Sequence, residues 1–179
     1  MKGYHDSKTP MVIRDLWMTP KFVFDFYDRR FNFKCDFAAS ADNTLCEHYF
    51  SAPDGLDENK GALFASTGDG CLCGNVWCNP PYSNIMPWVK KCHELSVQTG
   101  FVFVMLIPAD TSVAWFKYAF DNCAECHLIS GRLSFINEET RKPASGNNKG
   151  SVVFIFDQKL PIRKRVILID RDSMKEISE

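Results

Sequence analysis

Apolar residues occur along the chain in short continuous runs, separated by segments with the spacing of amphipathic helices. The longest run, 101–108, is of the kind found in central parallel strands. Strands are expected at 33–37, 48–50, 74–78, 101–108 and 126–129. Helices are expected at 21–28, 85–98 and 111–120, and in the second of these Ile85, Val89 and Cys92 form one apolar face. Strands that alternate with helices predict an α/β sheet covered by helices on both faces.

The last third of the chain has a different pattern. Three apolar runs, 132–136, 151–156 and 165–169, follow one another without a helical segment between them. We therefore expect antiparallel strands at one edge of a mainly parallel sheet. Between the first two runs lies a polar, glycine-bearing segment, 137–150, which we expect to be exposed.

Length and composition indicate one ordinary globular domain. The chain has 179 residues, of which 45% are hydrophobic and 24% are charged. We expect a polar N-terminal arm over residues 1–16 and a single domain over 17–179. No apolar stretch has the length of a membrane span, and residues 1–10 do not resemble a signal peptide, so a cytoplasmic location without membrane contact is expected. We expect a monomer.

The eight cysteines raise the question of a metal site. In a reducing compartment they argue against disulfides. Cys123 and Cys126 with His127 have a familiar zinc-ligand spacing, but no second pair accompanies them. Cys71, Cys73 and Cys78 do not have such a spacing. No metal is expected.

The most informative motif is Asn79-Pro80-Pro81-Tyr82, which directly follows the strand expected at 74–78. The two prolines end the strand and make the loop stiff. The loop thus presents an amide, carbonyl acceptors and an aromatic ring at a strand end. This combination suits a planar amine that must be held by acceptors while its ring is stacked, as the N6 amine of an extruded adenine must be.

With this motif the chain resembles the S-adenosylmethionine-dependent amino methyltransferases. Two further motifs, Trp17-x-Thr19-Pro20 and Gly131-Arg132-Leu133-Ser134-Phe135, make it similar to the phage-type DNA N6-adenine methyltransferases, the Dam family. The resemblance covers about 17–156 and implies a Rossmann-like methyltransferase fold. It also implies methyl transfer from S-adenosyl-L-methionine to N6 of adenine in double-stranded DNA, with protection of phage DNA from host restriction as the purpose. Asn79, Pro80, Pro81 and Tyr82 are the implied catalytic residues.

The resemblance also implies a cofactor site. Thr19 and Pro20 can begin a helix, and a helix N-terminus suits the carboxylate of the donor. The turn after the strand at 33–37 has small residues where cofactor-binding domains usually have glycines. An acid about 20 residues further on commonly holds ribose hydroxyls. The cofactor residues expected are Trp17, Thr19, Pro20, Asp36, Ala38, Ser40, Asp54 and Asn79.

The DNA contacts are expected near the C-terminal part. The net charge is −1, which does not by itself favour a nucleic-acid partner, but basic residues are concentrated between 141 and 165. We expect the 137–150 segment to read the DNA. The candidate DNA-binding residues are Arg132, Arg141, Lys142, Asn147, Asn148 and Lys149.

Two alternatives stay open on the sequence. The Asn-Pro-Pro-Tyr motif also occurs in enzymes that methylate RNA bases or glutamine side chains, and the motif alone does not separate these substrates. A protein of another class, a non-enzymatic binding module that uses the basic C-terminal face, is also consistent with the residues.

Overall fold

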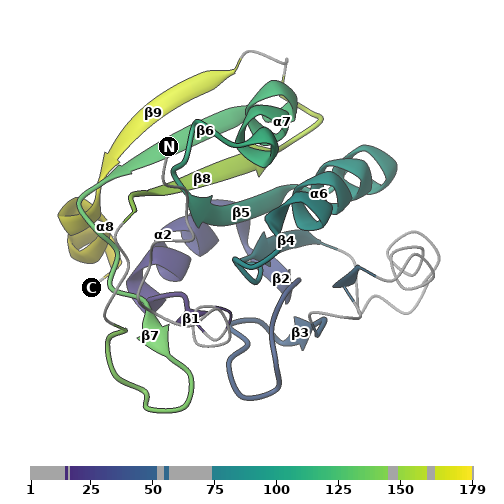
Figure 1. Ribbon diagram of the computed structural model, residues 1–179. Helices are drawn as coiled ribbons and strands as arrows, with labels where there is room; N and C mark the ends of the chain where they lie inside the picture. Colours follow the sequence, from purple (N-terminus) through teal and green to yellow (C-terminus); the bar gives the residue numbers. More distant parts are fainter. Residues whose placement is uncertain are drawn as a thin grey trace.

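The fold is known from a computed structural model, which describes residues 15, 17–51, 55–56, 74–144, 149–160 and 164–178. A seven-stranded sheet forms its centre, in the order β3-β2-β4-β5-β8-β6-β9 (Figure 1). The strands are β2 (Phe33–Asp36), β3 (His48–Tyr49), β4 (Asn75–Cys78), β5 (Phe103–Pro108), β6 (Glu125–Ser130), β8 (Ser151–Phe156) and β9 (Arg165–Asp170). The strands expected at 33–37, 48–50, 74–78, 101–108, 126–129, 151–156 and 165–169 are thus present, in a mainly parallel sheet.

The expected placement of the antiparallel strands was wrong. Only β8 is antiparallel to its neighbours within this sheet, and it lies inside the sheet, between β5 and β6. Both edge strands, β3 and β9, are parallel to their neighbours. The physical reason is burial, because all six residues of β8 are buried and such a strand needs neighbours and cover on every side.

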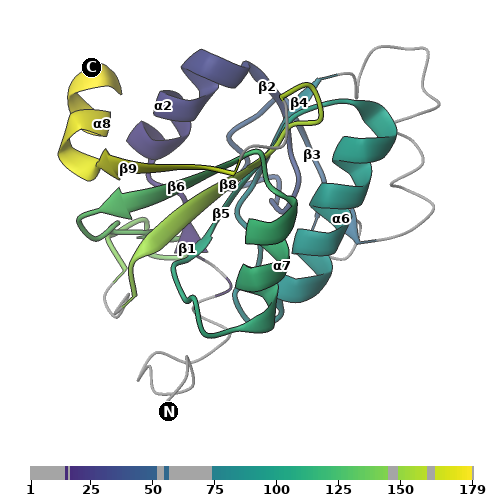
Figure 2. The ribbon, with the colours of Figure 1, turned by 90° about the horizontal axis from the view of Figure 1, so that it is seen from above.

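Four helices cover the sheet in the part of the chain that is described. They are α2 (Lys21–Phe31), α6 (Ile85–Thr99), α7 (Ala114–Asn122) and α8 (Arg171–Ser178). Figure 2 shows α2 and α8 on one face of the sheet and α6 and α7 on the other. Helix α8 was not predicted, because its segment is short and strongly polar, with two apolar residues, Met174 and Ile177. None of the helices among the described residues is long and apolar enough to cross a membrane.

Local chemistry explains where two helices end. Helix α6 ends at Gly100, whose φ of 69° lies in the left-handed region that glycine adopts readily. Helix α2 ends at Asn32, with a φ of 50°, and its Asn32 N–H donates to the carbonyl of Asp28. The expectation that Thr19 caps α2 was wrong. The capping position is Pro20, no side-chain cap bond is present, and Thr19 is buried instead.

A separate two-stranded ribbon joins distant parts of the chain. Strand β1 (Trp17–Met18) pairs antiparallel with β7 (Ile136–Asn137). The strand expected at 132–136 is therefore absent from the main sheet. After β6, Gly131 adopts a φ of 84° and the chain turns away, while Leu133 and Phe135 remain buried. In Figure 1 the ribbon lies at the sheet edge to which β2 and β4 point.

The sheet has a switch point beside β2. From β2 the chain moves outward to β3 on one side and then returns to β4 on the other. At such a point the connections after two adjacent strands diverge, and α/β proteins bind ligands in the resulting crevice. Asp36 is the last residue of β2, and Asn79 directly follows β4. The topology thus places the two predicted site segments side by side.

Candidate active site

A pocket lies at this switch point. The open space among its lining residues is about 320 Å³, a volume that includes open solvent. Its lining comes from four segments: the residues around β1, the end of β2, the loop that follows β2, and the start of the loop after β4. The lining residues are Asp15, Trp17, Met18, Thr19, Asp36, Ala38, Asn43, Leu45 and Asn79. Segments separated by up to 60 residues of sequence therefore form one polar pocket.

The Asn79 carboxamide is fixed by two hydrogen bonds. Its Nδ2 donates to the carbonyl oxygen of Trp17 at 2.9 Å, which links the β4 loop to β1. Its Oδ1 accepts a hydrogen bond from the Tyr82 hydroxyl at 3.0 Å. The first bond orients the amide so that Oδ1 is its acceptor end. The atom expected to receive hydrogens from a target amine is therefore occupied by Tyr82.

Three aromatic side chains hold this arrangement together. The rings of Trp17 and Phe135 are stacked, with centroids 5.6 Å apart and an interplanar angle of 14°. Tyr82 meets both edge-on, at 6.4 Å from Trp17 and 5.9 Å from Phe135. All three side chains are buried. The three motifs that are far apart in sequence thus meet in one cluster, and the Tyr82 ring lies inside it.

Asp36 is a buried carboxylate in the pocket lining. Its side chain is 4% exposed and accepts a hydrogen bond from the Leu45 N–H at 3.3 Å. Burial raises the pKa of this carboxyl to about 7, against the hydrogen bonds from Leu45 and Ala38, which lower it. No cation near Asp36 is among the causes of this pKa shift. A buried carboxylate without a neighbouring cation favours a ligand that brings positive charge or hydroxyl donors.

The turn after β2 is built without glycine. Asn43 Oδ1 accepts a hydrogen bond from the Ser40 N–H at 2.7 Å, and the Thr44 N–H donates to the Ser40 carbonyl at 3.0 Å. An asparagine that closes its own turn in this way replaces the conformational freedom that glycines usually provide. Small residues at Ala38 and Ala39 keep the side chains short where the chain passes the pocket.

The pocket contains five of the eight expected cofactor residues. Trp17, Thr19, Asp36, Ala38 and Asn79 line it, whereas Pro20 and Ser40 do not. Asp54 lies outside the described residues. Sequence reasoning missed Asp15, Met18, Asn43 and Leu45. Met18 could have been found, because it lies inside the Trp-x-Thr-Pro motif, but Asn43 and Leu45 have no motif around them.

A hairpin that begins with β7, residues 136–143, contacts the loop that follows β2. The Ser40 hydroxyl donates to Glu138 Oε1 at 2.8 Å. Arg141 donates from one guanidinium nitrogen to the Asp42 carbonyl at 3.0 Å and from another to Met18 Sδ at 3.3 Å. Arg141 also has a φ of 55°, which a residue with a side chain rarely adopts. In this structure the exposed Arg141 therefore links Met18, in the pocket lining, to the loop that follows β2.

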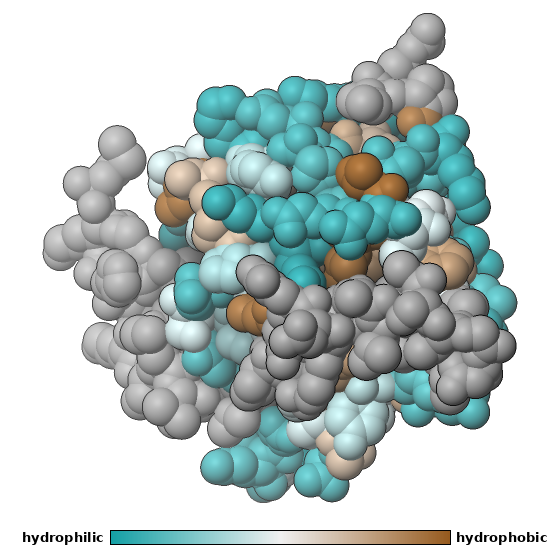
Figure 3. Space-filling model, turned by 90° about the vertical axis from the view of Figure 1, so that its right-hand side faces the viewer, coloured by the Kyte–Doolittle hydropathy of each residue, from teal (hydrophilic) through white to brown (hydrophobic). Residues whose placement is uncertain are grey.

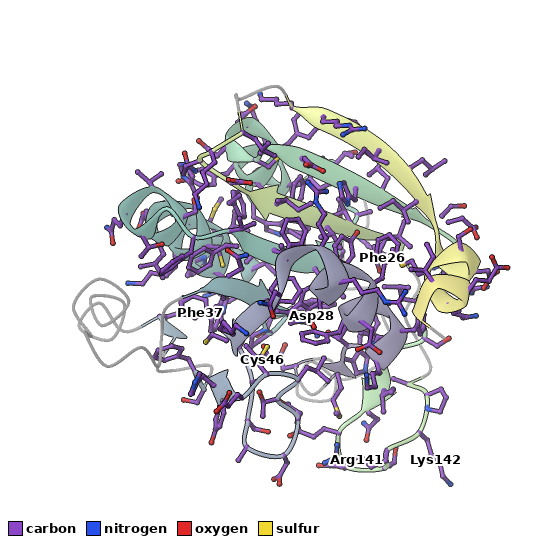
Figure 4. The ribbon with its side chains drawn as sticks, turned by 180° about the vertical axis from the view of Figure 1, so that it is seen from behind. Phe26, Asp28, Phe37, Cys46, Arg141 and Lys142 are labelled. Atoms are coloured by element: carbon purple, nitrogen blue, oxygen red, sulfur yellow. The ribbon has the colours of Figure 1, made fainter. Side chains whose placement is uncertain are left out.

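The remaining DNA candidates lie in different surroundings. Lys142 is exposed, and Figure 4 shows its side chain pointing away from the molecule, beside Arg141 on the hairpin. Arg132 is also exposed. Lys149 forms a partly buried ion pair with Asp110, and this pair lowers the pKa of the Asp110 carboxyl. Asn147 and Asn148 lie outside the described residues.

The expectation of one basic face near the C-terminus was wrong. Strand β8 runs opposite to its neighbours. Residues that precede β8 therefore lie at the carboxyl ends of the parallel strands, and residues that follow it lie at their amino ends. Lys142 and Lys149 precede β8, on the side of the pocket. Lys159, Lys164 and Arg165 follow it, at the other edge (Figure 1). The charge concentration in the sequence is therefore divided in space.

A second group of titratable residues lies away from the pocket. Glu125 accepts hydrogen bonds from Arg30 at 2.9 and 2.5 Å, and its Oε2 is 2.8 Å from His127 Nε2. Tyr27 is 3.2 Å from His127 Nδ1. Arg30 chiefly lowers the pKa of Glu125, to about 2, and burial lowers that of His127. Both nitrogens of His127 thus have partners within this network, and the group stabilises the packing of α2 on β6.

The cysteines singled out in the sequence lie in two segments, 71–78 and 123–126. Within the ranges described, no group of three or more His, Cys, Asp or Glu side chains is arranged to hold a metal ion. Cys78, Cys123 and Cys126 are buried free thiols. Burial raises the pKa values of Cys123 and Cys126 to about 12 and about 11, so these thiols are protonated near neutral pH. Cys71 and Cys73 lie outside the described residues.

The fold and the pocket define a class of protein: an α/β protein with a polar pocket at the carboxyl ends of parallel strands, beside an Asn-Pro-Pro-Tyr loop. Comparison of the sequence with known families identifies the family to which the chain belongs. The family described as DNA N-6-adenine-methyltransferase (Dam) matches residues 6–179, and the chain belongs to this family.

Two curated relatives agree with this assignment. The chain is 38% identical over 171 residues to the DNA N-6-adenine-methyltransferase of Escherichia phage T1, a match that covers 87% of this chain and 68% of the relative. It is 33% identical over 156 residues to the DNA N-6-adenine-methyltransferase of Haemophilus phage HP1 (strain HP1c1), with 87% and 86% covered. The resemblance noted in the sequence is thereby confirmed.

Proposed function

We propose that the protein transfers a methyl group from S-adenosyl-L-methionine to the N6 amine of adenine in double-stranded DNA. One observation carries the proposal. Asn79 places its amide between the pocket beside Asp36 and the buried aromatic ring of Tyr82, at the switch point of the sheet. Membership of the Dam family and the names of both phage relatives support the substrate.

The sheet supports a Rossmann-like methyltransferase fold. Six of its seven strands run in the same direction, and the pocket lies where the chain reverses its course across the sheet, between β2 and β4. Helices cover both faces. These are the features of doubly wound nucleotide-binding folds.

The pocket residues fit the donor on chemical grounds. The donor carries a positive sulfonium, an ammonium, a carboxylate and ribose hydroxyls, and when bound it supplies an electrophilic methyl group. Asp36 offers a buried carboxylate to the cationic or hydroxyl groups, and Thr19 offers a hydroxyl. The indole N–H of Trp17 is buried and has no hydrogen-bond acceptor among the described residues, so it is available to an acceptor on a ligand.

The chain's own residues then position the amine. Asn79 Oδ1 and the Pro80 carbonyl accept the two hydrogens of N6, which directs the nitrogen lone pair toward the methyl group and stabilises the positive charge that develops. Pro80 and Pro81 keep the loop rigid. Tyr82 leaves Asn79 Oδ1 and stacks on the extruded base, a contact of about 1–3 kcal/mol by typical base–aromatic values. No covalent enzyme intermediate is required.

Exposed cations supply the phosphate contacts. Lys142 and Arg132 are exposed candidates, and Asn147 and Asn148 remain candidates for base contacts. Arg141 acts on the pocket side of the hairpin, as its contacts with Met18 and Asp42 indicate. Such an enzyme acts in the host cytoplasm, where methylation protects phage DNA from restriction.

One experiment separates this function from its alternatives. The protein is incubated with radiolabelled S-adenosylmethionine and, in parallel, with duplex DNA, RNA or protein, and the labelled product is identified. The proposal predicts label in DNA as N6-methyladenine. Label in RNA or in glutamine would assign the same chemistry to another substrate. DNA binding without any labelled product would support the non-enzymatic binding module.

A further inference from the structure

The outer edge of β9 has a composition that does not match its position. Four consecutive residues, Val166–Ile169, are apolar, which is typical of a strand buried on both faces. Yet β9 pairs with β6 on one side, and no strand pairs with its other side within the described ranges. Val166 is 52% exposed and Leu168 is 71% exposed. Exposed apolar edges favour pairing with another chain.

Both faces of β9 are incompletely covered. Ile167 and Ile169 line a second hollow on the side of α2, together with Phe26, Tyr27, Arg30, His127 and Arg165. Figure 4 shows Phe26 on α2 beside this part of the sheet. Val166 and Leu168 point to the opposite face, because side chains alternate along a strand. By contrast, the side of the molecule shown in Figure 3 is mainly hydrophilic, with small separate apolar spots outside its grey region.

Symmetry restricts how β9 can pair with a second copy of itself. When a two-fold axis relates two adjacent antiparallel strands, the axis is perpendicular to the sheet. A given residue therefore lies on the same face of the sheet in both copies. Residues directly opposite each other lie on the same face, and their numbers must therefore differ by an even number. Registers centred on Ile167 or on Leu168 satisfy this rule.

On the face that carries Val166 and Leu168, the register centred on Ile167 is complementary in charge and in hydrophobicity, whereas on the other face it places Arg165 opposite Ile169 of the second copy. It places Val166 opposite Leu168 of the second copy and Lys164 opposite Asp170 of the second copy, twice each by symmetry. Lys164 is 39% exposed and its present partner is the exposed Asp121 at 3.0 Å. The register centred on Leu168 instead places Val166 opposite Asp170 on the first face and Arg165 opposite Arg171 on the other, so that like charges face one another.

Asp170 can make this contact without leaving its present role. It accepts the N–H groups of Asp172 and Ser173 at the start of α8, each at 3.0 Å, and both bonds end on Oδ2. Oδ1 is the oxygen that remains for Lys164 of the second copy. The charged ends of β9 thus complement the apolar centre.

We propose that β9 is a self-association surface, through which two copies of the chain form an antiparallel, two-fold symmetric pair with Ile167 at the axis. The sheet then continues from one copy into the other. A six-residue strand contact belongs to the small, transient class of interfaces, so the dimer dissociates on dilution. Because the partner's strands run in the opposite direction, the two pockets open at opposite edges of the joint sheet. Turnover per site is therefore the same in monomer and dimer.

The test is sedimentation velocity over a concentration series, with the full chain and matched variants. The wild type is expected to show a concentration-dependent dimer, and Leu168→Lys is expected to abolish it. Val97 is a matched control, since it is 57% exposed on α6, and Val97→Lys is expected to keep the dimer. Circular dichroism and turnover check that both variants are folded. A wild type that is monomeric at every concentration, or a dimer that survives Leu168→Lys, would overturn the proposal.

The register has its own test. Lys164→Glu and Asp170→Lys are each expected to weaken the dimer, because each places like charges opposite one another. The double variant restores opposite charges and is expected to recover the dimer. Since Asp170 also caps α8, an Ile167→Cys variant provides a second measurement, with a disulfide between the two copies expected under mild oxidation. Failure of both the charge exchange and the cross-link would rule out this register.

Discussion

Removing the Tyr82 hydroxyl tests whether this group blocks the acceptor of the target amine. In the structure the hydroxyl donates to Asn79 Oδ1 at 3.0 Å. The Asn79 amide keeps its orientation without this bond, because its Nδ2 still donates to the Trp17 carbonyl at 2.9 Å. Tyr82→Phe therefore frees Oδ1 and leaves the aromatic cluster with Trp17 and Phe135 intact.

The magnitude follows from the energy of one hydrogen bond. A neutral hydrogen bond contributes about 1 kcal/mol net, which corresponds to roughly a fivefold change in an equilibrium constant. We expect Tyr82→Phe to increase the population of extruded base by up to about that factor, with kcat within about threefold of wild type. Tyr82→Ala, by contrast, loses the ring and is expected to lower kcat/KM by about 5- to 150-fold, from a stacking energy of about 1–3 kcal/mol.

The assay uses duplex DNA with a fluorescent adenine analogue at the target position. Its emission rises when the base leaves the stack, so the extruded fraction can be compared between wild type and Tyr82→Phe. Steady-state methylation of ordinary DNA gives kcat and KM for the same variants. A Tyr82→Phe enzyme that extrudes the base but has lost turnover would show that the hydroxyl acts in the reaction itself, and the blocking role would be refuted.

Three further predictions concern the pocket and the fold. Arg141→Ala is expected to weaken cofactor binding by up to about fivefold in calorimetry. Lys142→Ala, its neighbour, is expected to leave that affinity unchanged and to reduce the salt dependence of DNA binding by about one unit of slope; the opposite pattern would return Arg141 to the DNA interface. Burial raises the folded-state pKa of Asp36 to about 7, so the folded protein keeps a proton that the unfolded chain loses above about pH 4. The free energy of unfolding is therefore expected to fall as the pH rises from about 4 to 7. Urea titrations at several pH values should show that Asp36→Asn lacks this contribution, and an identical pH dependence in both proteins would contradict it. Glu125→Gln is expected to reduce the free energy of unfolding by about 1–3 kcal/mol, whereas the exposed Asp121→Asn is expected to reduce it much less. Equal urea midpoints of the two variants would show that the buried network adds nothing.

The sequence predicted the elements of the sheet better than their arrangement. Continuous apolar runs indicate strands because buried strands need apolar side chains on both faces, and β5 and β8 are fully buried as expected. The same burial means that the apolar pattern does not show the order or direction of these strands, since an interior antiparallel strand and an interior parallel strand have the same run of apolar residues. β8 was expected at an edge because no helical segment separates its apolar run from the runs before and after it.

The candidate site was predicted where a residue belongs to a motif. Trp17, Thr19 and Asn79 were named from such motifs and line one pocket, and Asp36 was named from its strand end. Asn43 was not named, because its part in the pocket depends on a turn that an asparagine closes locally. The role expected of Arg141 depended on its charge and on its place in the 137–150 segment, and neither shows that its guanidinium contacts Met18 and Asp42.

The central claim is that Asn79 receives the amine that is methylated. The most direct measurement compares wild type with Asn79→Ala in two experiments: formation of N6-methyladenine from radiolabelled cofactor and duplex DNA, and calorimetric binding of the cofactor alone. The account predicts a loss of product of at least about 100-fold, as for removal of one stabilising group at a reacting centre, with cofactor affinity nearly unchanged. An Asn79→Ala protein that methylates adenine at the wild-type rate, or that loses cofactor binding to the same extent as activity, would contradict it.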